Sequence, residues 1–259
     1  MTELQRAWRR RLAGRICGWL AVSGLVVWAL WWTKFDLGTL MAAGPRFSEF
    51  FGRLVPPDWS STNLIVRSTI ETVMIALAGT ALAVVAALPL GFLAATNVSP
   101  PWVSHPVKWL LGFIRSMPLI VVALLCVTAV GLGPFPGMLA IAFHSVGMLG
   151  KFYAEELETA EKGIVEAVRG TGATWAQTVR YGLVPQSVPQ LLTFTIYRFE
   201  MNFRDAAVLG LVGAGGIGFY IQLYVRGFQY EKVAVLLLVI VAVVTVLDQL
   251  TFWIRHWVR

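Results

Sequence analysis

Long apolar segments alternate with short polar or proline-rich segments along the whole chain. Three apolar segments are long enough to cross the roughly 30 Å apolar core of a membrane: 16–32, 72–95 and 233–253. Three shorter apolar blocks predict further helices: 118–130, 137–149 and 188–211. The pattern therefore predicts an all-α integral membrane protein with about six transmembrane helices, the first spanning residues 16–33.

The segments between the apolar blocks predict the loops. Residues 34–68 are mixed in charge and contain several prolines, so we expect an external loop that carries one surface helix. Residues 97–106 contain three prolines and predict a second loop, and residues 131–136 predict a tight external turn. Gly150 and Lys151 are expected to end the short fourth helix and return the chain to the cytoplasm.

Composition and charge agree with a membrane protein. The 259 residues are 57% hydrophobic and only 14% charged, which excludes an ordinary soluble domain. The net charge of +7 comes from basic residues that flank apolar blocks, so it indicates membrane orientation and no nucleic-acid partner. Both termini, residues 1–15 and 255–259, are basic and predicted to be cytoplasmic; their basic residues are Arg6, Arg9, Arg10, Arg11, Arg15, Arg255, His256 and Arg259. No small-x-small cleavage site follows residue 32, so the first helix is expected to stay uncleaved. Cys17 and Cys126 lie inside apolar blocks and are expected to be unpaired.

The fifth apolar block contains charges that are costly in lipid: Arg198, Glu200, Arg204 and Asp205. One interpretation is structural, because Glu200 and Arg204 can neutralise each other, as can Arg198 and Asp205 through Asn202. The other is functional, because a guanidinium binds phosphorus oxyanions bidentately. We therefore expect a substrate pathway at Arg198, Asn202, Arg204 and Asp205, with His144 and Arg115 beside it. A stripe of Ile196, Phe199 and Phe203 is expected to face lipid.

A polar stretch at 151–187 stands between two apolar blocks. Its residues Glu166, Ala167, Gly172 and Pro185 follow the spacing E-A-x-x-x-x-G, then twelve residues, then P. This spacing resembles the cytoplasmic coupling loop of ABC-importer permeases, two short helices that dock on an ATPase subunit. Gly170 and Gly172 are expected to bend the chain between helices at 155–164 and 173–181, and Pro185 to end the second helix. The resemblance implies that Glu166, Ala167, Arg169, Gly170, Gly172 and Pro185 contact the ATPase. Val168 and Gly182 depart from the family pattern, and a generic amphipathic surface loop remains the alternative.

A glycine run at 210–218 contains G-x-G-x-x-G. A dinucleotide site needs a preceding strand, whereas a membrane helix precedes this run, so that reading is rejected. The alternatives are a flexible turn at the outer membrane face or a tightly packed outer turn near a gate, formed by Gly213, Gly215, Gly216 and Gly218.

Five short motifs taken together resemble the permease of phosphonate-type ABC importers, from about Thr69 to Leu250: Arg115–Pro118, Gly131–Pro134, His144–Lys151, Tyr197–Glu200 and Val208–Gly218. The resemblance implies a type I importer fold over residues 69–254 in a bacterial cytoplasmic membrane. It also implies a homodimer, two ATPase subunits that bind ATP and Mg²⁺, and an external binding protein for phosphonate, phosphite or phosphate. No phosphate-binding loop is present, because Ser145 stands where its first glycine would be, so no cofactor is expected in this chain.

Other classes of protein were weighed against a permease. An intramembrane enzyme needs clustered catalytic or metal-binding groups, whereas His105, His144 and His256 are scattered, so no catalytic or metal site is expected. A passive channel or scaffold would need no coupling loop. Among importers, a permease for an amino acid or a quaternary amine is the alternative.

Overall fold

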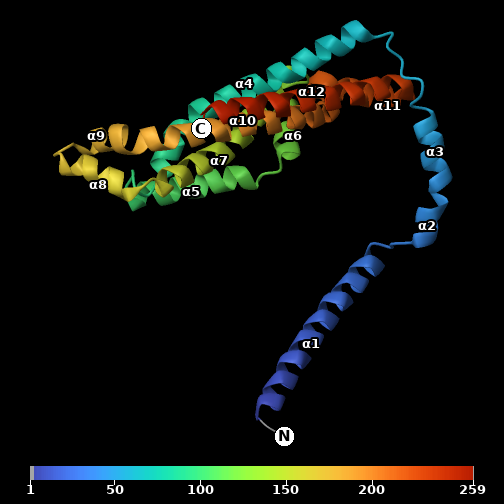
Figure 1. Ribbon diagram of the computed structural model, residues 1–259. Helices are drawn as coiled ribbons and strands as arrows, with labels where there is room; N and C mark the ends of the chain where they lie inside the picture. The colour runs from blue at the N-terminus through green and yellow to red at the C-terminus, as the bar shows by residue number, and fades with distance from the viewer. Residues whose placement is uncertain (1–2, 259) are drawn as a thin grey trace. The chain divides into compact units, whose positions relative to one another are not determined.

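The computed structural model describes the backbone of residues 3–258 and the side chains of residues 14–254, and all regular elements there are helices (Figure 1). By its internal contacts the chain divides into two units, residues 1–53 and residues 54–259. Apart from Arg15, the basic residues predicted to fix the two termini lie outside the described side chains: Arg6, Arg9, Arg10, Arg11, Arg255, His256 and Arg259.

The first unit contains α1 (Glu3–Trp32), α2 (Leu37–Ala42) and α3 (Gly44–Gly52). Lys34 ends α1 in a left-handed conformation with φ 51°, and the amide of Phe35 donates back to the carbonyl of Leu30 at 3.0 Å. Asp36 then caps α2 by accepting hydrogen bonds from the amides of Gly38 and Thr39. The predicted loop thus carries two short helices where one was expected.

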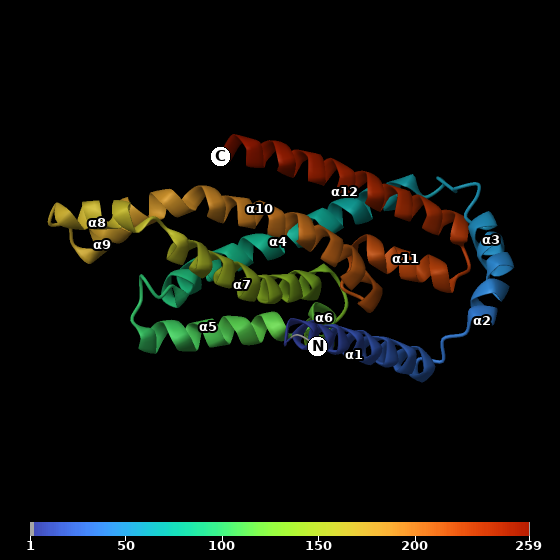
Figure 2. The ribbon, with the colours of Figure 1, turned by 60° about the horizontal axis from the view of Figure 1, so that its bottom comes forward.

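The second unit is a helical bundle whose elements are α4 (Thr62–Ala94), α5 (Pro101–Ser116), α6 (Leu119–Val130), α7 (Pro134–Thr159), α8 (Lys162–Gly170), α9 (Trp175–Gln177), α10 (Val184–Leu209), α11 (Gly216–Arg226) and α12 (Tyr230–Val258). A π-helical turn, Thr178–Leu183, joins α9 to α10, and a 3₁₀ turn, Gly210–Val212, follows α10. Figure 2 shows α4, α7 and α10 side by side, with α8 and α9 at one end.

Small residues allow α4 and α7 to pack closely in parallel. A Cβ added at Gly79 would lie 2.7 Å from the Ile141 side chain, and one at Gly91 would lie 2.7 Å from that of Tyr153. The two contacts are twelve residues apart on both helices, so the helices run in the same direction in register. Such close approach is how helices associate where lipid removes the hydrophobic driving force.

Three described helices or parts of helices are long and apolar enough to cross a membrane: 14–32, 62–94 and 230–254. Two further helix pairs qualify only when joined across a bend, α5 with α6 at 84° and residues 175–212 with α11 at 40°. The sequence predicted about six crossings, and α7, the predicted fourth, is not among these five. Its 26 residues include two prolines, His144 and a charged inner end.

Two predicted loop boundaries were wrong. Residues 97–106 were expected to be a loop, but α5 begins at Pro101, because a proline without an amide hydrogen is tolerated in the first helical turn. The fourth helix was expected to stop at Leu149, but α7 continues through Gly150 to Thr159. Gly150 does not end the helix. It allows α7 to approach α5 closely, since a Cβ there would lie 2.7 Å from the Leu111 side chain.

Candidate functional site

The polar stretch at 151–187 contains two helical arms around a glycine bend, as predicted, but the first arm was placed wrongly. A helix was expected at 155–164, whereas α7 ends at Thr159 and the arm itself is α8, Lys162–Gly170. Gly172 has φ +83°, a conformation that strains other residues, and a Cβ there would meet no heavy atom within 4 Å. Gly170 also has open space but is helical, so only Gly172 requires glycine by its backbone. Thr174 begins the second arm through a capping box with Gln177.

The outer face of α8 carries the residues predicted to contact an ATPase. Glu166, Ala167 and Arg169 are exposed, whereas Val165 and Val168 are half-buried. Gly182, a departure from the family pattern, lies where a Cβ would come within 3.5–3.6 Å of Val165 and Val168. These are ordinary contact distances, so Gly182 lies where the second arm packs on α8, which presents a charged face outward.

Pro185 does not end the second arm, contrary to the prediction. The amide of Val184 donates to the carbonyl of Val179, a π-helical bond one residue longer than the α-helical one. Pro185 follows in the first turn of α10, where it removes one backbone hydrogen bond without ending the helix. The second arm and α10 consequently form one uninterrupted helical rod.

An acidic residue near the C-terminal end of α7 ties the loops beside this stretch together. A carboxylate oxygen of Glu158 accepts hydrogen bonds from Lys108 Nζ at 2.6 Å, the Thr96 amide at 2.7 Å and Thr96 Oγ1 at 2.8 Å. Partial burial acts to raise the pKa of Glu158, but the bonds from Lys108 and Thr96 outweigh it and lower the pKa below the usual value. Glu158 thus stabilises the fold by joining α7 to Thr96 and to Lys108 on α5.

The glycine run is a packed turn and not a flexible one. Gly213, Gly215 and Gly216 have φ of 90°, 79° and 70°. At Gly218 an added Cβ would overlap the Ala207 carbonyl oxygen. The run ends by starting α11, a helix that the sequence analysis did not predict.

Two side chains from α4 cap the beginning of α11. Glu71 Oε1 accepts from the Gly216 amide at 2.7 Å, and Thr72 Oγ1 accepts from the Ile217 amide at 2.8 Å. The amide of Gly133 also donates to the carbonyl of Gly213 at 2.9 Å. Glu71 and Thr72 were not identified from the sequence as part of this turn. Glu71 could have been noticed, because it is an acidic residue directly before an apolar block.

One polar cluster on α10 is buried between α4 and α7. Arg198 is only 4% exposed; its Nε donates to Ser145 Oγ at 3.0 Å and its Nη2 lies 3.4 Å from Asp205 Oδ2. Ser145 donates to Asn202 Oδ1 at 3.0 Å, and Asn202 donates to Thr80 Oγ1 at 2.8 Å. Arg198 pairs with Asp205 as predicted, but directly, because Asn202 bonds Ser145 and Thr80 and does not bridge the pair.

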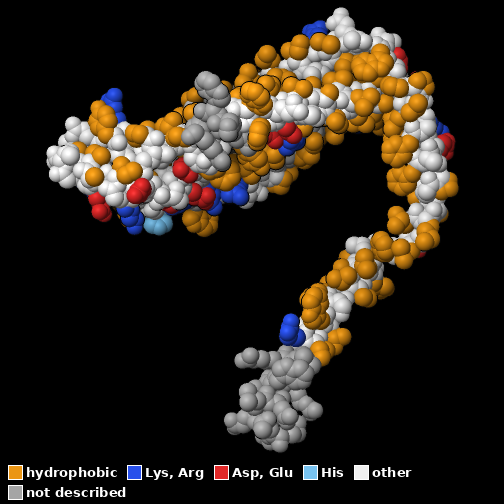
Figure 3. All heavy atoms as spheres, viewed as in Figure 1, with side chains coloured by type: hydrophobic (Ala, Val, Ile, Leu, Met, Phe, Trp, Pro, Cys, Tyr) orange, Lys and Arg blue, Asp and Glu red, His pale blue; other side chains and the backbone are white. Residues whose placement is uncertain are grey.

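A second ionic cluster joins α10 to α12. Arg204 Nη2 lies 2.9 Å from Glu200 Oε1, the predicted pair, and 2.8 Å from Asp248 Oδ1. Thr251 Oγ1 donates to Glu200 Oε2 at 3.1 Å. Asp248 was overlooked because residues 233–253 were interpreted only as an apolar span. The Arg204 and Asp248 side chains are 39% and 45% exposed. Figure 3 shows that acidic and basic side chains are few within the largely apolar surface of the helical bundle.

His144 and Arg115 lie near the first cluster. His144 adjoins Ser145, which bonds Arg198, and a Cβ on Gly147 would lie 2.8 Å from the backbone nitrogen of Arg115. The Nδ1 of His144 is buried without a hydrogen-bond partner among the described residues. The structure therefore brings Arg115, His144 and Arg198 together at the bend between α5 and α6. Arg115 also lies over the Phe152 ring at 5.9 Å.

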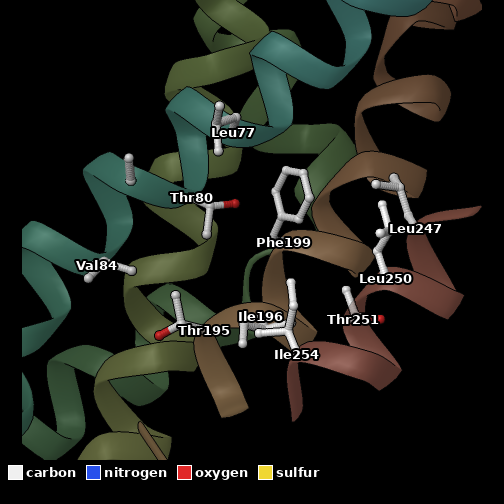
Figure 4. Close-up of a pocket in the computed structure, with 11 residues that line it drawn as sticks. Leu77, Thr80, Val84, Thr195, Ile196, Phe199, Leu247, Leu250, Thr251 and Ile254 are labelled. Atoms are coloured by element: carbon white, nitrogen blue, oxygen red, sulfur yellow. The ribbon is translucent and has the colours of Figure 1, made fainter. Parts of the chain in front are cut away.

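The predicted lipid-facing stripe was partly wrong. Phe203 is 1% exposed and belongs to the core with Ile75, Ile141 and Leu209. Ile196 and Phe199 instead line a groove of about 490 Å³ between α4, α10 and α12 (Figure 4). Three leucines and two isoleucines line much of the groove, which therefore suits a hydrocarbon chain better than an anion. Among the described residues no group of three His, Cys, Asp or Glu side chains could hold a metal ion.

Comparisons with known proteins agree with this architecture. Residues 87–259 match the family model described as the binding-protein-dependent transport system inner membrane component. The chain is 43% identical over 229 residues to the phosphite transport system permease protein PtxC of Stutzerimonas stutzeri, covering 88% of this chain and 83% of that one. It is 38% identical to the phosphate-import permease protein PhnE of Mycolicibacterium smegmatis, covering 87% of this chain but 43% of that one.

A solved structure supports the fold. The structure resembles a chain of the inward-facing MetNI methionine ABC transporter with a TM-score of 0.70 and 21% sequence identity. The match covers 78% of this protein and 99% of that chain. The predicted type I importer architecture is thereby confirmed. The chain belongs to the family of inner-membrane components of binding-protein-dependent transport systems.

Proposed function

We propose that this chain is the permease subunit through which an ATP-driven importer moves a phosphorus oxyanion, namely phosphonate, phosphite or phosphate, across the cytoplasmic membrane. The observation that carries the proposal is its 43% and 38% identity, over most of its length, to permeases named for phosphite and phosphate. Transport proceeds by alternating access, with the substrate delivered by an external binding protein. Both termini lie in the cytoplasm.

The loop at 151–187 is the surface that couples this chain to its ATPase subunits. The exposed charges of Glu166 and Arg169 and the bend at Gly172 support this role. Two ATPase chains bind ATP and Mg²⁺, and each meets one copy of α8. Ala167, Gly170 and Pro185 belong to the same surface or position it.

The substrate passes the basic residues gathered at the α5–α6 bend: Arg198, His144 and Arg115. Asp205 holds Arg198 at 3.4 Å, which is long beside the 2.9 Å between Arg204 and Glu200, so an oxyanion competes with Asp205 for the guanidinium. Asn202 keeps Arg198 aligned through Ser145. The nearby carboxylates keep the binding weak enough for release.

The pathway lies between two copies of this chain. Arg204 and Asp248 stand within the membrane-spanning segments with 39% and 45% of their side chains exposed. Ionised groups are costly in lipid, so this exposure favours coverage by a second copy or by the aqueous pathway. The turn at Gly213, Gly215, Gly216 and Gly218 forms the outer rim of the gate.

Uptake measurements test the substrate. The permease, its ATPase and its binding protein are expressed together in cells that lack their own phosphite and phosphonate importers. We expect growth on phosphite, phosphonate or limiting phosphate as sole phosphorus source, and no growth with Glu166→Ala and Gly172→Val combined. Binding protein that co-purifies with an amino acid or a quaternary amine would overturn the assignment in favour of that substrate class.

A further inference from the structure

The two short helices that follow α1 carry exposed apolar stripes. On α2 these are Leu37, Leu40 and Met41, and on α3 they are Phe47, Phe50 and Phe51, each set with the i, i+3, i+4 spacing of one helical face. Leu40, Met41, Phe47 and Phe51 are 58%, 81%, 57% and 62% exposed. Aromatic and aliphatic groups aligned in this way favour a partner that is itself apolar.

The other side of α3 is polar. Glu49 lies opposite the phenylalanines, with Arg46 and Arg53 at the border of the stripe, and Arg53 Nη2 forms an ion pair of 2.7 Å with Glu49 Oε1. Both side chains of that pair are more than half exposed, as expected for groups that face water. With six and nine residues, α2 and α3 are far too short to cross a bilayer. Two-faced helices of this kind lie in the plane of a membrane interface.

The end of α1 places these helices at such an interface. Its last turns carry Trp28, Trp31 and Trp32, which are 58%, 72% and 71% exposed, and tryptophans of spanning helices collect at the level of the lipid headgroups. The left-handed Lys34 and the cap formed by Asp36 start α2 at Leu37, which full extension puts at most roughly 18 Å from Trp32. The stripes therefore begin where the apolar core of the bilayer ends.

We propose that α2 and α3 lie flat in the interface of the bilayer, with the phenylalanine and leucine side chains among the upper acyl chains and with Arg46, Glu49 and Arg53 in water. The partner is the lipid interface itself and not an anionic headgroup, because Lys34, Arg46 and Arg53 are nearly balanced by Asp36 and Glu49. The proposal needs only that α1 spans the membrane; that this face is the external one rests on the proposed topology. The connection between the first two spans is then tethered to the surface.

Paired cysteine probes on α3 test the proposal. Cys17 and Cys126 are replaced by serine, and Phe51→Cys or Glu49→Cys is labelled with a polarity-sensitive dye in the full chain, reconstituted with its ATPase into phosphatidylcholine vesicles. Side chains 49 and 51 are 64% and 62% exposed in the structure, so a difference between the dyes reports what covers α3 in the membrane. We expect the dye at 51 to emit at shorter wavelength and to be quenched by lipids brominated near the headgroup. The dye at 49 should be quenched by aqueous iodide.

Each other result overturns the proposal. Equal quenching of both dyes by iodide would mean that α3 stands in water. Protection of the dye at 51 from both iodide and brominated lipid would mean that protein covers the stripe, either this chain or a second copy. Quenching that appears only when phosphatidylglycerol is added would mean that anionic headgroups, and not the apolar stripe, hold the helix. Phe47→Ser with Phe50→Ser, in the labelled Phe51→Cys chain, should move that dye toward water while ATPase activity confirms that the complex is intact.

Discussion

Arg204 on α10 and Asp248 on α12 form an ion pair of 2.8 Å within the membrane-spanning part of the bundle. The same guanidinium reaches Glu200 at 2.9 Å, so one arginine holds two carboxylates on two helices. The carboxylate of Asp248, which lies in the long apolar helix α12, is thereby neutralised by an arginine on α10.

Asp248→Asn should loosen α12 from α10. We expect a loss of about 1 kcal/mol in the free energy of unfolding, because single polar contacts between membrane helices contribute on that scale. Thermal unfolding of the purified complex measures it. Glu155→Gln is the matched control, since Glu155 lies 3.9 Å from Lys151 in an exposed pair and should change little. Equal effects of the two substitutions would show that the Arg204–Asp248 pair has no special stabilising role.

Gly170 and Gly172 should respond differently to alanine. Gly172→Ala forces a residue with a Cβ into φ +83°, at a cost of about 1–2 kcal/mol, and should distort the bend and lower transport-coupled ATP hydrolysis. Gly170→Ala places a better helix former in open space without backbone strain, so its effect should be smaller than that of Gly172→Ala. ATP hydrolysis stimulated by the loaded binding protein distinguishes the two variants. If both variants hydrolysed ATP equally well, the positive φ at residue 172 would not be the reason that a glycine is needed there.

Arg198→Ala should reduce uptake per folded complex by about ten- to hundredfold, because a hydrogen bond to a charged group contributes about 1.5–3 kcal/mol. Arg198→Lys should restore only part of it, since an ammonium cannot reproduce the planar fork. Membrane abundance measured by quantitative blotting provides the correction for folding. Normal uptake per folded complex in Arg198→Ala, with low abundance, would assign Arg198 a structural role through Asp205 and Ser145.

The bonds that Glu158 accepts from Lys108 and Thr96 should make part of the free energy of unfolding depend on pH. Its pKa is lowered in the folded protein from an ordinary 4.5, so its stabilising contribution is fully present above about pH 4.5 and is lost as pH falls through the lower folded value. Glu158→Gln should therefore lower the melting temperature at pH 7, and the difference from the unsubstituted protein should shrink below pH 4.5. Melting curves between pH 7 and pH 4 measure the difference. A constant difference over this range would show that the charge of Glu158 does not contribute.

Patterns that depend on neighbouring residues were predicted well from the sequence. The apolar blocks, the glycine bend and the pairs of α10 all follow from spacing along one helix, and the structure contains them. Asp248, Ser145 and Glu71 were missed because their partners lie on other helices, and no spacing along the chain reveals which helices meet. The proline boundaries failed for a different reason: Pro101 and Pro185 both begin helices, and composition alone does not distinguish a proline that starts a helix from one that ends it.

The π-helical turn at residues 178–183 has a mechanical consequence. Helical structure continues from Trp175 to Leu209, so the second arm of the loop and Arg198 lie on one helical segment. Between them stand the π-helical turn and the prolines at 185 and 189, which are features at which helices bend. A tilt of the arm would therefore reach Arg198, and its contact with Ser145 on α7, only through these bending points.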